Sequence, residues 1–81
     1  MKEQEIETRI QELVGEEHRL RERLASGEIS AAEEHARLAE AEAALDRMWD
    51  LLRQRRALRD SAGDPDKAKA RPVDEVEHYL Q

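Results

Sequence analysis

The sequence feature that most constrains the fold is the regular spacing of apolar residues in the first third of the chain. The residues lie four, three, seven and four positions apart; they are Ile6, Ile10, Leu13, Leu20 and Leu24. This spacing places one apolar stripe along a single side of an α-helix, which another helix must then cover. Because a second apolar stripe follows a short break, the sequence predicts an all-α fold of packed helices.

The break between the two stripes predicts a tight turn. Gly27 suits the left-handed conformation that ends a helix, and Ser30 with Glu33 forms a capping box for the next helix. We therefore expect helices over residues 2–25 and 31–60, joined by a connection so short that they form an antiparallel two-helix hairpin. Residues 1–60 are the hairpin, and residues 61–81 are a partly ordered C-terminal arm. The arm is expected to contain a short helical turn started by Asp64 and Pro65 and a last helix over residues 72–80.

The apolar arc of the second helix is wider than one facing helix covers. The residues expected on a core or dimer face are Leu38, Ala41, Leu45, Met48, Trp49 and Leu52, and Ala44, Leu51 and Leu58 widen the arc. Either a second hairpin packs there, giving a homodimeric four-helix bundle, or the arm folds back over it. Dimerisation is favoured because a core in 81 residues without cysteine rarely supplies more than about 3–5 kcal/mol.

Trp49 is the one large aromatic residue of the predicted hairpin. A tryptophan on an apolar helix face is expected in the core, where its ring supplies packing area. The alternative is a hot spot for a ligand or partner.

A net charge of −6 argues against nonspecific binding to nucleic acid or to anionic membranes. Against this background, Arg53, Arg55, Arg56 and Arg59 form a basic cluster, the candidate partner-binding site. The structural explanation is that they favour the helix dipole and that antiparallel pairing brings them close to Glu3, Glu5 and Glu7. The alternatives are an acidic protein partner and, in a nucleic-acid-associated regulator, phosphates. No aromatic platform for nucleic acid accompanies the cluster.

Catalytic and metal-binding patterns are sparse. The chain has no cysteine, no Gly-rich phosphate loop and no zinc-protease motif. In Glu16-Glu17-His18 and in Glu33-Glu34-His35, adjacent residues point about 100° apart on a helix and share no face. Glu75 and His78 have the spacing of a helical di-iron site but lack the partner carboxylates. We expect a protein that is not an enzyme and that binds no cofactor and no metal. The alternative is metal-dependent redox chemistry.

The longest apolar run is far shorter than the roughly 20 residues that span a bilayer, and the first residues lack the apolar region of a secretory signal. A cytoplasmic protein that does not contact membranes is expected.

Stretches along nearly the whole chain carry a resemblance to a known family. The most specific is residues 45–57, with Trp49-Asp50-Leu51-Leu52-Arg53-Gln54-Arg55-Arg56; the others are Ile10–Val14, Glu16–His18, Arg71–Val73, Glu75–Glu77 and Tyr79-Leu80. Together they resemble small actinobacterial proteins catalogued as domain of unknown function 2630. The resemblance implies an actinobacterial protein. It implies no particular activity, ligand or site residue. The expected function is that of a non-enzymatic interaction or scaffold protein, acting through oligomerisation and a macromolecular partner.

Overall fold

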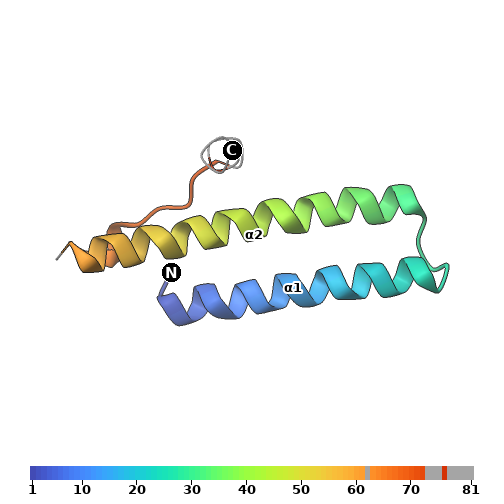
Figure 1. Cartoon of the computed structure of the whole chain (residues 1–81), viewed down its shortest axis with the longest axis horizontal. Helices are drawn as coiled ribbons and strands as arrows, with labels where there is room; N and C mark the ends of the chain where they lie inside the picture. Colours follow the sequence, from blue (N-terminus) through green and yellow to red (C-terminus); the bar gives the residue numbers. More distant parts are fainter. Residues whose placement is uncertain (62, 73–75, 77–81) are drawn as a thin grey trace.

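The computed structural model describes residues 1–61, 63–72 and 76, and in this range the chain is helical without any strand (Figure 1). Helix α1 spans Glu3–Ala25, α2 spans Ala31–Asp60, and a 3-10 turn, η1, spans Pro65–Lys67. The two long helices lie antiparallel and pack along their length. The predicted all-α antiparallel hairpin is confirmed, and both helices begin and end within one residue of the expected positions.

Backbone hydrogen bonds explain why α1 ends where it does. Gly27 has a φ of 79°, which glycine adopts without the strain that a Cβ atom causes. The backbone N–H of Glu28 donates to the carbonyl oxygen of Arg23 at 2.9 Å, and that of Gly27 donates to Leu24 at 3.1 Å. These two bonds form a Schellman motif, as the position of Gly27 in the sequence predicts.

Side-chain caps define the starts of the next two elements. The hydroxyl oxygen of Ser30 accepts a hydrogen bond from the backbone N–H of Glu33 at 3.1 Å, and the hydroxyl donates to the Glu33 carboxylate at 3.2 Å. In the same way, the Asp64 carboxylate accepts from the backbone N–H of Asp66 at 3.0 Å and caps η1. Both predicted starts are confirmed.

The densest part of the core lies at the open end of the hairpin, where the N-terminus of α1 lies beside the C-terminus of α2. Buried apolar residues on the two helices are Ile6, Ile10, Leu13, Leu20, Ala41, Leu51 and Leu52. Of these, Ile6, Ile10, Leu51 and Leu52 form one cluster, against which Leu45, Met48 and Ala68 pack. Toward the turn the core thins to Leu13, Leu20 and Ala41.

Trp49 is not a core residue of this chain, contrary to the expectation. Its side chain is 43% exposed, whereas Leu52, on the adjacent helical turn, is 1% exposed. Ala41 and Leu52 mark the side of α2 that faces α1. At about 100° per residue, Trp49 lies roughly 60–80° away from both, on the flank of the helix. Its other expected role, a partner-binding face, stays a prediction.

The C-terminal arm runs back along α2 on the side opposite α1 (Figure 1). Ala68 packs against the core cluster, and Val76 is fully buried. The arm thus covers part of the wide apolar arc within the same chain. The predicted last helix over residues 72–80 lies largely outside the described residues.

Candidate functional site

Two arginines of the predicted basic cluster contact acidic residues at the start of α1. Arg59 approaches the Glu3 carboxylate at 3.3 Å, and Arg56 approaches Glu3 at 3.8 Å and Glu7 at 3.7 Å. Glu5, the third predicted acid, instead caps α1 through its carboxylate. The antiparallel pairing of the helices therefore gives Arg56 and Arg59 the structural role expected for them.

Arg55 is buried and holds the arm on α2. One guanidinium nitrogen donates to the carbonyl oxygen of Pro65 and to the carboxylate of Asp66, both at 3.1 Å. Lys2 contacts the same carboxylate at 3.1 Å. Hydrogen bonds from Lys2, and then from Arg55, hold the pKa of Asp66 below its ordinary value. Arg55 is thus occupied within the chain and is not presented to a partner.

Arg53 differs from the other three arginines. It is exposed, and in the part of the chain that the structure describes no ion pair includes it. The four arginines therefore do not form one free basic surface.

A buried carboxylate fastens the arm at its other end. Asp50 is 1% exposed and accepts hydrogen bonds from Arg71 Nε at 2.8 Å and from Gln54 Nε2 at 2.8 Å. A second guanidinium nitrogen of Arg71 contacts the other carboxylate oxygen. The bond from Arg71 lowers the pKa of Asp50; burial raises it, and Gln54 lowers it further. The net pKa lies below the ordinary value, so Asp50 is the anion that anchors Arg71 near neutral pH.

Backbone contacts extend this clamp along the arm. The Gln54 amide donates to the carbonyl oxygen of Lys69 at 2.7 Å and accepts from its N–H at 3.3 Å. Arg47 donates to the carbonyl oxygen of Arg71 at 3.1 Å. Arg47, Asp50 and Gln54 share one side of α2 because they are three and four residues apart.

Sequence reasoning missed this clamp, although a signal was present. Asp50 lies within the run Trp49-Asp50-Leu51-Leu52, where an acid among apolar residues requires a partner if it is buried. The missing information was the position of Arg71, which is set only when the arm folds back.

Helical periodicity places Val14 and Trp49 on the same face of the hairpin. The Glu7–Arg56 contact marks this face. Val14 follows Glu7 by seven residues and Trp49 precedes Arg56 by seven, which is close to two turns in each helix. Because the helices are antiparallel, both steps lead in the same direction. Val14 is 45% exposed.

We call this surface the Trp49 face; it consists of Val14, Leu38, Leu45 and Trp49. Leu38 and Leu45 are half-buried and lie within about 40° of Trp49 around α2. The other members of the predicted dimer or core face, Met48 and Leu52, belong to the hairpin's own core, against which Leu45 also packs with part of its surface.

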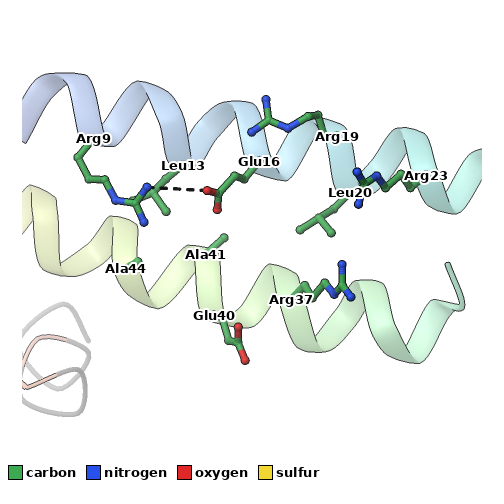
Figure 2. A pocket seen from close by; sticks show the side chains of 10 residues that line it. All are labelled: Arg9, Leu13, Glu16, Arg19, Leu20, Arg23, Arg37, Glu40, Ala41 and Ala44. Atoms are coloured by element: carbon green, nitrogen blue, oxygen red, sulfur yellow. Dashed lines mark ion pairs between the residues drawn. The ribbon is translucent and has the colours of Figure 1, made fainter. Parts of the chain in front are cut away.

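The opposite side of the hairpin carries a groove of about 360 Å³ between α1 and α2, near the turn (Figure 2). Leu13, Leu20, Ala41 and Ala44 form its floor, and charged side chains form its rim. The rim residues are Arg9, Glu16, Arg19, Arg23, Arg37 and Glu40.

The described residues contain no group of three or more His, Asp or Glu side chains that could hold a metal ion. The Glu75–His78 pair lies outside them. None of the described helices is long and apolar enough to cross a membrane.

Comparison with known proteins places the chain in a family. Residues 2–81 match the family described as "Protein of unknown function (DUF2630)". Uncharacterized proteins of Mycobacterium bovis and Mycobacterium tuberculosis are 54% identical over 70 residues, which cover 86% of this chain and 80% of theirs. No solved structure matches the chain. The matched length and this identity show that the chain belongs to the DUF2630 family, with relatives in actinobacteria.

Proposed function

We propose that the chain is a non-enzymatic interaction protein that works by self-association through the Trp49 face. The observation that carries this proposal is the tryptophan side chain, 43% exposed beside an equally exposed valine. Tryptophan is enriched among residues that dominate binding energy. The other sides of α2 pack against α1 and the arm or border the alanine-lined groove, so the Trp49 face is the flank on which large apolar side chains are exposed.

Charges beside the Trp49 face favour a second copy of this chain as the partner. Glu42 and Arg53 are both exposed, and neither forms an ion pair with the described residues. They are eleven residues apart, close to three helical turns, so they lie on one side of α2 with Leu45 and Trp49 between them. The face thus carries an acid at one end and a base at the other.

This charge order selects an antiparallel dimer. If two α2 helices paired in parallel, Glu42 would oppose Glu42 and Arg53 would oppose Arg53, which is repulsive. A two-fold axis perpendicular to the helices instead brings Glu42 of each copy to Arg53 of the other, with the two Trp49 side chains near the axis. Burial of Trp49 and Val14 supplies affinity, and the charges set the orientation.

Molar mass by light scattering across a dilution series tests self-association. We expect the wild type to be a dimer. Trp49→Gln should raise the dissociation constant of the dimer about tenfold or more relative to the wild type. Ala36→Gln is the matched control, because position 36 is exposed and lies about 140° from Trp49 around α2. Circular dichroism should show the same helicity in all three proteins. A wild type that is monomeric at every concentration overturns the proposal.

A charge swap tests the antiparallel orientation separately. Glu42→Arg and Arg53→Glu should each weaken the dimer, because each places like charges opposite one another. The double variant should recover the wild-type dissociation constant. If the double variant dissociates more readily than either single variant while the wild type is dimeric, the orientation is wrong and self-association stands.

A further inference from the structure

The groove of Figure 2 lies on the side of the hairpin away from the Trp49 face. Around α2, Ala44 is about 140° from Trp49, and around α1, Glu16 is about 160° from Val14. A dimer formed through the Trp49 face therefore leaves this groove open. Binding in the groove therefore does not depend on self-association through the Trp49 face.

Small side chains produce the hollow. Ala41 and Ala44 of α2 face Leu13 and Leu20 of α1, and Leu20 points into the space between the helices (Figure 2). Alanine leaves room that a leucine would fill. The floor is therefore apolar, with a space that fits large apolar side chains from outside.

The rim charges are distributed unevenly along the groove. At the end farther from the turn, Arg9 is neutralised by Glu12 at 3.1 Å and by Glu16 at 3.8 Å. Nearer the turn, Arg23 has only a long contact of 3.8 Å with Glu28. Arg37 has no ion pair with any described residue.

Arg23 and Arg37 come from different helices and stand on the two sides of the groove near Leu20, and Glu40 lines the groove one turn of α2 farther from the hairpin turn (Figure 2). Two cations that flank an apolar floor attract a negative charge to the space between them. This cationic end is notable in a chain of net charge −6.

We propose that this groove binds an acidic amphipathic helix of a partner protein. The helix inserts large apolar side chains over Ala41 and Ala44 and presents carboxylates to Arg23 and Arg37. Helix-in-groove docking uses this combination of apolar anchors and flanking charges.

The shape of the groove favours a helix over a small amphiphilic anion. The lining residues of α1 extend from Arg9 to Arg23, which is about 21 Å at 1.5 Å per residue. The groove is partly open to solvent, so an alkyl chain lying in it would stay partly wet. A helix covers the floor with one row of side chains and shields it with the rest of its surface.

The test uses the full chain and two labelled peptides of roughly 18 residues, each with a leucine stripe at helical spacing. Glutamates flank the stripe in one peptide and lysines in the other. Fluorescence anisotropy should show binding of the glutamate peptide, with the lysine peptide about tenfold weaker or more. Equal affinities, or no binding of the glutamate peptide, would overturn the proposal.

Two variants locate the binding site. Arg37→Glu should weaken the glutamate peptide about tenfold, while Lys67→Glu, the same charge change at an exposed position of η1, should leave it within about twofold. Ala44→Leu should fill the hollow and abolish binding without lowering the thermal midpoint, an effect that a structural role alone would not produce. Unchanged binding in Arg37→Glu and Ala44→Leu contradicts the assignment. Binding of dodecanoate in place of the peptide, lost in Arg37→Glu, would overturn the helix in favour of a small amphiphile.

Discussion

The two halves of the hairpin are built differently. In the half at the open end of the hairpin, α2 lies between α1 and the arm, and a cluster that includes Ile6 and Leu52 is buried. In the half near the turn, α2 packs on α1 and a groove opens between them. The arm acts as a third layer in the half where it lies on α2. The two-layered half has a thinner core and carries the groove that we propose as a binding site.

The composition of α2 explains this difference. Its first half is rich in alanine, at positions 31, 32, 36, 39, 41, 43 and 44, whereas leucines follow at 45, 51, 52 and 58. Alanine favours helix formation but buries little apolar area. The turn half is therefore helical without being well packed.

The largest expected contrast comes from truncating one leucine in each half. Leu52→Ala should lower the free energy of unfolding by about 3 kcal/mol, because a buried leucine is replaced by a cavity. Leu38→Ala, at a half-buried position of the turn half, should cost about 1 kcal/mol. Urea denaturation followed by circular dichroism measures both. Equal losses would contradict the difference between the halves.

Removing the buried carboxylate should have the next largest effect. Asp50→Ala removes the hydrogen bonds that Arg71 donates to this carboxylate and so weakens the attachment of the arm to α2. Because the Arg71 side chain is 34% exposed and regains water, we expect a loss of about 2 kcal/mol, below that of a fully buried pair. Asp60→Ala, at an exposed aspartate with a 3.9 Å contact to Arg59, is the matched control and should change stability by less than about 0.5 kcal/mol. If both variants unfold at the same urea concentration, the clamp contributes nothing.

Acid should lower the free energy of unfolding by protonating the Asp50 carboxylate, which holds the arm on α2. The folded pKa of Asp50 lies below the unfolded value of about 3.9, so the unfolded chain binds the proton more readily. The stability that this ionised group contributes is complete above about pH 5 and is lost as the pH falls toward the folded pKa. Between about pH 7 and about pH 3, Asp50→Ala should therefore lose less free energy of unfolding than the wild type. Equal losses would show that Asp50 is not a source of the acid sensitivity.

Replacing two glycines of the turn half by alanine should change the free energy of unfolding by small amounts of opposite sign. Gly27→Ala forces a φ of 79° on a residue with a Cβ atom and should cost about 1 kcal/mol. Gly15→Ala should raise the free energy of unfolding by up to about 1 kcal/mol, because alanine has a higher helix propensity than glycine. Its Cβ would meet only the end of the flexible Arg19 side chain, at 3.3 Å. Thermal unfolding of the two variants should bracket the wild type, and a destabilised Gly15→Ala would mean that Arg19 is held rigidly.

The hairpin was predictable from the sequence because its signals are local. The apolar spacing from Ile6 to Leu24, the Gly27 turn and the Ser30 cap each depend on neighbouring residues, and all are confirmed. Helix length and antiparallel packing follow from them.

The covering of α2 was not predictable in the same way. The width of the apolar arc showed that something must cover it, but both the arm and a second chain satisfied that requirement. The choice depends on the contact of Asp50 with Arg71, which are 21 residues apart. For the same reason Trp49 was expected in the core: local spacing places it near the arc, and only the packed structure shows that it lies on the flank.

The most direct test of self-association is the fluorescence of Trp49, the single tryptophan of the chain, over a dilution series. The proposed dimer would bury this side chain, which is 43% exposed in the single chain. We expect the emission maximum to lie at shorter wavelength in concentrated protein and to move to longer wavelength on dilution, in step with the fall in molar mass. An emission maximum that stays constant while the mass halves would place the interface elsewhere and contradict the Trp49 face.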